Sequence, residues 1–207
     1  MKRVRGVCFI DSGDVATAYR GAILRSEHQH ACPMTVSETP HLRLRHVRSA
    51  DAPFVLELLT DPDFLANVGD RDVHNLQDAH RYIMAGPAAS YRRHGFGLWL
   101  VELKSAALAI GLCGLLRRDT HPDVEIGFAL LPRFRHRGYA LEAAQAALRL
   151  GTEEFGLTRI VAITAPGNGD SIRILETLGL KFERLVRFTP DGSESRLYVL
   201  ERARRPA

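Results

Sequence analysis

The chain has 207 residues, of which 45% are hydrophobic and 25% are charged, and its formal net charge is +4. These values are ordinary for a globular protein of one domain, with or without a tail. They argue against a membrane protein, because no apolar run reaches the length of a bilayer span. We expect a cytoplasmic protein whose three cysteines, Cys8, Cys32 and Cys113, are reduced thiols, since they are odd in number and widely separated.

Residues 1–40 differ from the rest of the chain. They mix Gly, Ser, His, Cys and Pro without a sustained hydrophobic period, which is typical of a poorly ordered extension. The alternative interpretation of the segment 1–33 is that the start codon was assigned too early and that the protein begins at Met34. We therefore predict an extension over residues 1–40 and a single domain over residues 41–203.

Hydrophobic periodicity predicts alternating strands and helices from residue 41 onward. One strand and three helices come first; three strands, a long helix, a strand, a short helix and a final hairpin follow. The predicted ranges are strand 41–47, helices 50–61, 76–86 and 87–95, strands 95–104, 108–118 and 123–131, helix 138–155, strand 159–165, helix 169–178, and strands 180–188 and 194–202. This order indicates an α/β domain with a mixed, mostly antiparallel central sheet flanked by helices.

The most basic turn of the chain precedes the long helix that begins at Gly138. A helix N-terminus has backbone N–H groups without partners and a positive partial charge, so phosphate groups bind there. Gly138 tolerates unusual backbone angles, Ala140 is small, and Arg135 and Arg137 add positive charge. The turn is therefore predicted to bind a polyphosphate. A basic surface turn that only begins a helix is the alternative.

The same turn carries a family resemblance. The chain has no GxxxxGK[ST] and no GxGxxG run, but Arg135-x-x-Gly138-x-Ala140 resembles the acetyl-CoA pyrophosphate loop, [Q/R]-x-x-G-x-[G/A], of the GNAT N-acetyltransferase superfamily. The strand 123–131 stands where GNAT proteins have a splayed strand that hydrogen-bonds pantetheine through its backbone. The resemblance covers about residues 41–203 and implies a GNAT fold with splayed cofactor-binding strands.

A second motif refines the resemblance. Asn168-x-x-Ser171, followed by Leu178-Gly179, is similar to the NxxSxxxLxxLGF signature of the Rim-type branch, whose members include ribosomal-protein N-terminal acetyltransferases. The resemblance implies acetyl-CoA as co-substrate. The expected cofactor-binding residues are Phe128 and Leu130 on the strand, Arg135, His136, Arg137, Gly138, Tyr139 and Ala140 in the turn, and Asn168 before the last helix.

Two residues are the candidates for catalysis. Glu125 occupies a position where an acidic residue is the base in some GNAT enzymes, and it alternates with the small residues Gly127 and Ala129. A solvated carboxylate or a partner for a nearby arginine is the alternative, and Glu102 is a weaker second candidate for the base. The Rim-type pattern implies that Ser171 hydrogen-bonds or protonates the leaving thiolate; the alternative is that it only caps its helix.

Other residues receive structural interpretations. Glu142 in the first turn of the long helix favours the helix dipole, and Trp99 is expected in the core. Asp70 and Arg71 are expected to form surface salt bridges, although substrate contact is the alternative. The nine histidines show neither HxxxH nor HExxH spacing, so we expect no metal site.

These observations predict an acetyl-CoA-dependent N-acetyltransferase that acts by direct attack of a primary amine on the thioester. The acceptor is a peptide N-terminus or a small-molecule amine. The alternatives are use of another acyl-CoA and a non-catalytic acyl-CoA sensor of the same fold. Nucleic-acid binding is disfavoured because the basic residues are not interleaved with stacking aromatic residues. We expect no membrane partner, and a monomer or homodimer.

Overall fold

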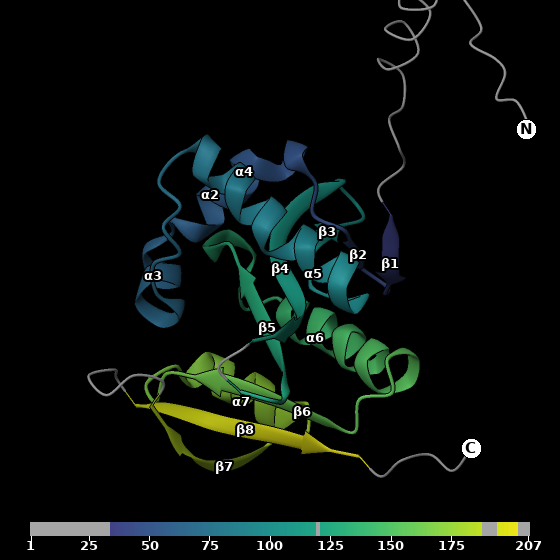
Figure 1. Ribbon diagram of the computed structural model, residues 1–207, viewed down its shortest axis with the longest axis vertical. Coiled ribbons are helices and arrows are strands. Elements are labelled where there is room, and N and C mark those ends of the chain that lie inside the picture. Colours follow the sequence, from purple (N-terminus) through teal and green to yellow (C-terminus); the bar gives the residue numbers. More distant parts are fainter. Residues whose placement is uncertain (1–33, 119–120, 188–193, 203–207) are drawn as a thin grey trace, which may run out of the picture. The chain divides into compact units, whose positions relative to one another are not determined.

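The computed structural model describes residues 34–118, 121–187 and 194–202. One eight-stranded sheet organises them, in the order β1-β2-β3-β4-β5-β6-β8-β7 (Figure 1). The strands are β1 (Thr35–Glu38), β2 (Leu42–Arg45), β3 (Leu98–Leu103), β4 (Leu108–Arg117), β5 (Val124–Leu130), β6 (Arg159–Thr164), β7 (Lys181–Val186) and β8 (Ser195–Glu201). Only β5 and β6 pair in parallel, and the six other pairs are antiparallel. The predicted mixed, mostly antiparallel sheet is confirmed.

The helices lie in the connections from β2 to β3, from β5 to β6 and from β6 to β7. They are η1 (Ser49–Asp51), α2 (Ala52–Leu59), α3 (Pro62–Val68), α4 (Leu76–Ala85), α5 (Pro87–His94), η2 (Pro132–Phe134), α6 (Tyr139–Arg149), the π-helical turn η3 (Leu150–Glu154) and α7 (Gly169–Thr177). Helix α6 packs against β2, β4 and β5, and α4 packs against both α2 and α5. Among the helices described, none combines the length and apolar character needed to cross a bilayer.

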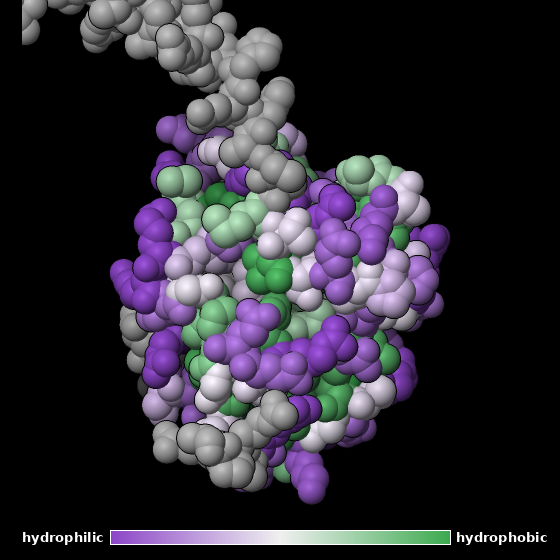
Figure 2. Space-filling view, turned by 90° about the vertical axis from the view of Figure 1, so that its right-hand side faces the viewer, coloured by the Kyte–Doolittle hydropathy of each residue, from purple (hydrophilic) through white to green (hydrophobic). Residues whose placement is uncertain are grey.

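The core lies around the central strands β3 and β4. Consecutive residues of both strands are buried, which means that both faces of the sheet are covered there. Trp99 is fully buried, as predicted, and Cys113 is a buried free thiol; Cys8 and Cys32 lie outside the described residues. The face shown in Figure 2 is mostly hydrophilic, with small apolar areas between the polar side chains.

The folded domain begins earlier than the sequence predicted. Residues 35–38, assigned to the extension over 1–40, form β1, which pairs with β2. The backbone N–H of His46 donates to the carbonyl of Met34 at 3.1 Å, and the Thr39 hydroxyl donates to the Glu142 carboxylate at 2.5 Å. The predicted boundary at residue 41 is therefore corrected to Met34, while residues 1–33 lie outside the described part of the chain.

This boundary can be tested by truncation. A chain that begins at Met34 retains β1, and we expect it to keep the melting temperature and the acetyl-CoA affinity of the full chain. A chain that begins at His41 loses β1 and the contact of Thr39 with α6, and we expect its melting temperature to fall by roughly 5 °C or more. Scanning calorimetry of the three chains measures both effects. A large fall in the chain that begins at Met34 would show that residues 1–33 stabilise the domain.

Helix α3 was missed by the hydrophobic periodicity. Its beginning has a clear local cause: the Asp61 side chain accepts a hydrogen bond from the Phe64 N–H at 3.2 Å, and Pro62 occupies the first turn. Acidic N-caps followed by proline are typical of helix starts. The helix ends at Gly69, whose φ of +92° disfavours other residues. The Asp61-Pro62 pair was the sequence signal for this helix start. The helix was still missed, because seven residues are too few to show a clear hydrophobic period.

Candidate functional site

Strands β5 and β6 separate along their length. They pair only through Val124 with Ile160 and Glu125 with Val161, whereas β5 stays paired with β4 as far as Leu130. Beyond Glu125, the edge of β5 that faces β6 therefore has no strand partner among the described residues. The divergence of the two strands (Figure 1) opens a gap in the sheet at this edge.

The backbone of β5 offers hydrogen-bonding groups to this gap. The N–H of Leu131 donates to the Ile110 carbonyl at 3.0 Å, and antiparallel pairing alternates along a strand. Residues 127 and 129 therefore direct their backbone groups to β4, and Phe128 and Leu130 direct theirs to the gap. The Leu130 carbonyl accepts from Arg135 Nε at 2.9 Å. These groups match the edge predicted to hydrogen-bond pantetheine.

The turn before α6 forms a cradle of backbone donors. Gly138 has φ +82° and His136 has φ +57°, so the turn twice enters the left-handed region, which gathers successive N–H groups into an anion-binding concavity. The first α6 hydrogen bond runs from Glu142 N to Gly138 O, at 3.0 Å, and no described side chain caps the helix. Nothing lies within 4 Å of a Cβ placed on Gly138. This open, uncapped helix start fits a phosphate group.

A cleft of about 860 Å³ joins the cradle to the gap. The turn contributes Arg135, His136, Gly138 and Ala140, strand β5 contributes Phe128 and Leu130, and Asn168 and Ser171 line it at the start of α7. Seven of the nine residues predicted to bind cofactor line this cleft, and the other two, Arg137 and Tyr139, belong to the same turn without lining it. The shape of the cleft and its backbone donors fit a cofactor with phosphate groups.

The three arginines of the turn have different surroundings. Arg135 forms ion pairs with Asp63 and, at 2.9 Å, with Asp61, and Arg133 pairs with Glu57 at 2.5 Å. Arg137 is exposed and has no ion-pair partner among the described residues. Arg135, one of the two arginines predicted to add positive charge to the phosphate site, is therefore engaged in fixing the turn to α3 and β5. Arg137 is the free cation of the cradle.

A second cavity of about 360 Å³ lies on the other side of the gap. Its walls come from helices α3, α4, α5 and α7 and from strands β3, β4, β5 and β6. It shares seven lining residues with the larger cleft: Phe64, Asn67, Val68, Phe128, Ala129, Asn168 and Ser171. The two cavities therefore meet where β5 and β6 separate.

The residues at the start of α7 have distinct roles. The Asn168 side chain accepts a hydrogen bond from the Ser171 N–H at 3.1 Å and so caps α7. The cap is thus Asn168, and the alternative in which Ser171 only caps the helix is wrong. The half-buried Ser171 lines both cavities, and its hydroxyl makes no hydrogen bond to a described residue. Leu175, one turn later, is buried.

Glu125 lies in the wall of the smaller cavity and is buried. Its carboxylate accepts from Arg118 Nε at 2.6 Å and from a second Arg118 nitrogen at 3.4 Å. His121 Nε2 is 3.7 Å from the same carboxylate. The pairing with a nearby arginine, one of the two alternatives from the sequence, is therefore present. A role as base requires that a substrate ammonium share one of these oxygens.

Glu102, the weaker candidate for the base, lies elsewhere. It lines neither cavity and accepts from Arg43 at 2.9 Å and from Arg45 at 3.0 Å. Arg45 also pairs with Asp51 at 2.9 Å. Because its oxygens are used in this buried network, Glu102 is a structural residue.

Glu142 was predicted to be a structural residue of the first turn of the long helix. Its carboxylate also accepts a hydrogen bond from the His41 N–H at 2.9 Å, and this contact joins α6 to the start of β2.

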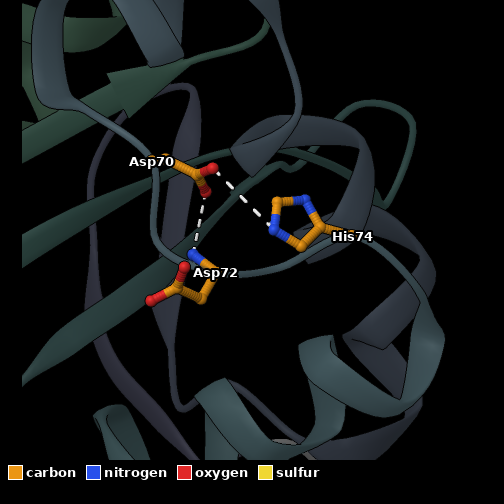
Figure 3. A group of neighbouring side chains, drawn as sticks. All are labelled: Asp70, Asp72 and His74. Carbon is orange, nitrogen blue, oxygen red and sulfur yellow. Dashed lines mark hydrogen bonds and ion pairs between the residues drawn. The ribbon is translucent and has the colours of Figure 1, made fainter.

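Three exposed side chains of the α3–α4 loop lie together, as Figure 3 shows. The ligand-type atoms of Asp70, Asp72 and His74 are within 4.8 Å of one another. Asp70 accepts from the Asp72 N–H at 2.8 Å and lies 3.8 Å from His74 Nε2. The three side chains lie close together because of these contacts within a surface turn. The contact of Asp70 with His74 agrees with the surface salt bridging expected of Asp70.

One side of the gap thus offers a concavity that fits phosphate and the other a smaller cavity, an arrangement that suits two substrates that meet at the gap. Residues 41–181 match the family described as "Acetyltransferase (GNAT) domain". A Bacillus subtilis protein named uncharacterized N-acetyltransferase YnaD is 39% identical over 157 residues, which cover 75% of this chain and 89% of that protein. The chain belongs to the GNAT acetyltransferase family.

Solved structures agree with this assignment. An acetyltransferase from Agrobacterium tumefaciens has a TM-score of 0.69 and 25% identity, over 80% of this chain and 94% of that chain. The ribosomal-protein-S5-alanine acetyltransferase from Vibrio fischeri has a TM-score of 0.67 and 17% identity, over 82% and 98% respectively; that likeness is one of fold. The predicted GNAT fold is confirmed, and the protein is an acyltransferase.

Proposed function

We propose that the protein transfers the acetyl group of acetyl-CoA to a primary amine, which attacks the thioester directly. The observation that carries the proposal is the meeting of the two cavities at the gap between β5 and β6. A thioester that enters from the larger cleft and an amine that enters from the smaller cavity reach the same point. Such proximity supplies a large part of the rate in reactions between two bound substrates.

The cofactor side uses mainly backbone groups. The pyrophosphate would bind to the cradle residues Arg137, Gly138, Tyr139 and Ala140. Because Arg135 is held in ion pairs with Asp61 and Asp63, Arg137 would supply the positive charge beside the phosphates. The groups of Phe128 and Leu130 that face the gap would align pantetheine. When bound, acetyl-CoA supplies an activated acyl carbon at the junction.

The chemistry then needs two proton transfers. A C–N bond forms as the amine attacks, and the C–S bond breaks. We assign removal of the amine proton to the Glu125 carboxylate, which lines the acceptor cavity, and donation of a proton to the sulfur to the Ser171 hydroxyl, which lies at the junction. General acid–base steps of this kind contribute about 10²–10⁴-fold to rates.

The acceptor class includes peptide N-termini in this proposal. The Asn168-x-x-Ser171 motif supports it, because it is shared with the Rim-type signature, and the Vibrio fischeri fold neighbour is named for a ribosomal protein. The direct test is a screen of N-terminal peptides and small amines, with the thiol released from acetyl-CoA as the readout. We expect turnover with at least one of them. Tight binding of acetyl-CoA with no amine-dependent release of thiol would overturn the proposal.

A further inference from the structure

The smaller cavity is strongly cationic. Its described lining includes four arginines, Arg71, Arg93, Arg117 and Arg118, and a single carboxylate, Glu125. None of these five residues lines the larger cleft. Since Arg118 pairs with Glu125, three arginine charges remain without a carboxylate partner in the cavity wall. These three charges therefore belong to the acceptor side of the site.

A phenol lines the same cavity as these arginines. Tyr82 of α4 lines the cavity, and burial raises the pKa of its phenol while the charges of Arg71 and Arg118 oppose the rise. The phenol is therefore neutral at physiological pH and can donate a hydrogen bond. The Tyr82 hydroxyl has no bond to a described residue, so Tyr82, Arg71 and Arg118 together present donors to the cavity.

Arg71 keeps most of its hydrogen-bonding capacity. One of its terminal nitrogens donates to the Val68 carbonyl at 3.2 Å, and this contact fixes the side chain on the α3–α4 loop. A guanidinium has five N–H donors, so a forked face remains for a ligand. Forked pairs of arginine with carboxylate or phosphate are about twice as strong as neutral hydrogen bonds. The half-buried position of Arg71 limits screening by solvent.

This charge discriminates among amines. A polyamine or a lysine-rich segment would bring further positive charge against three unpaired arginines, which electrostatics opposes. An amine that also carries an acidic group would replace water around these arginines with a matched anion. The amine would then lie at the junction beside Phe128 and Ser171, and the acid at the end of the cavity that does not open on the cofactor cleft.

We propose that the acceptor of this enzyme is a primary amine with a carboxylate or phosphate nearby in the same molecule, and that Arg71, with Arg118 and Tyr82, binds that acidic group. The inference rests on the proposed function and narrows its substrate class. Two sources share this chemistry, a peptide whose first residue is acidic and a free amino acid with its own carboxylate.

Matched pairs of acceptors test the inference. The peptide pair is Asp-Ala-Ala amide against Asn-Ala-Ala amide, and the amino acid pair is alanine against alaninamide. The readout is kcat/KM from thiol release at saturating acetyl-CoA. We expect the acidic member of one pair to be favoured at least about tenfold, which equals about 1.4 kcal/mol, and the pair in which this occurs identifies the source of the acid.

Arginine variants locate the effect. Arg71→Gln is expected to reduce the preference to within about threefold, mainly by raising KM for the acidic acceptor. Arg71→Lys keeps the charge but loses the fork and is expected to fall between the two. The matched control is Arg92→Gln, since Arg92 is an exposed residue of α5 that lines neither cavity. It should keep the full preference.

The outcomes separate the two proposals. Equal kcat/KM for both members of both pairs would overturn the anionic-acceptor proposal and leave the N-acetyltransferase function intact. If none of these four acceptors reacts, ligand-observed NMR titration of the same pairs in the presence of CoA decides. Tighter binding of an acidic member, lost in Arg71→Gln, supports the proposal, and equal affinities overturn it.

Discussion

Glu125→Gln is expected to slow the chemical step by about 10²-fold or more, with acetyl-CoA affinity unchanged. Glutamine keeps the size of the side chain and one oxygen that can accept from Arg118, so the wall of the acceptor cavity is preserved. What is lost is the group that takes the proton of the amine. The deficit should shrink as the pH rises above about 8, where an α-amino group loses its proton unaided.

The measurement is a pH–rate profile under single-turnover conditions. Ser171→Ala provides the comparison, because loss of a proton donor to the thiolate should slow the reaction without rescue at high pH. Glu102→Gln provides the control: it perturbs the buried network with Arg43 and Arg45, so we expect reduced stability and a chemical step close to that of the wild type. Near-wild-type rates in Glu125→Gln at every pH would remove Glu125 as the base and favour an ordered water.

Gly138→Asp is expected to weaken acetyl-CoA binding at least about tenfold, or about 1.4 kcal/mol. The site has room for a side chain, since nothing lies within 4 Å of an added Cβ, but φ is +82°. The aspartate would therefore place a negative charge in a cradle suited to phosphate. Isothermal calorimetry measures the affinity, and circular dichroism checks the fold.

The matched control is Gly138→Asn. Asparagine has nearly the same shape as aspartate and tolerates the left-handed conformation, but it has no charge. We expect it to lose much less affinity than the aspartate variant. Equal losses would assign the effect to backbone strain, and unchanged affinity in Gly138→Asp would remove the turn as the phosphate site.

The sequence predicted those parts of the site whose signal is local. The Gly138 turn and the alternation that sends Phe128 and Leu130 to one edge both depend on neighbours a few residues away. The central strands were equally accessible, because continuous apolar runs such as residues 108–116 are typical of strands buried on both faces.

The features that the sequence did not predict depend on contacts between residues distant along the chain. Arg135 pairs with Asp61 and Asp63, more than seventy residues away, and no spacing rule reports such a pair. Strand β1 was missed because its four residues are stabilised by pairing with β2 rather than by their own periodicity. The charged residues of the smaller cavity are likewise spread between Arg71 and Glu125, so its charge could not be summed before the fold was known.

The origin of the cavity walls has a consequence for how such an enzyme diversifies. The charged residues of the acceptor cavity lie between Arg71 and Glu125, whereas the phosphate cradle begins at Arg135. Substitutions on α4, α5 and the end of β4 can therefore change which amine is accepted without altering the turn that fits phosphate. The same fold can keep its acyl donor while its amine acceptor changes. Acceptor specificity can therefore evolve separately from the ability to transfer an acyl group.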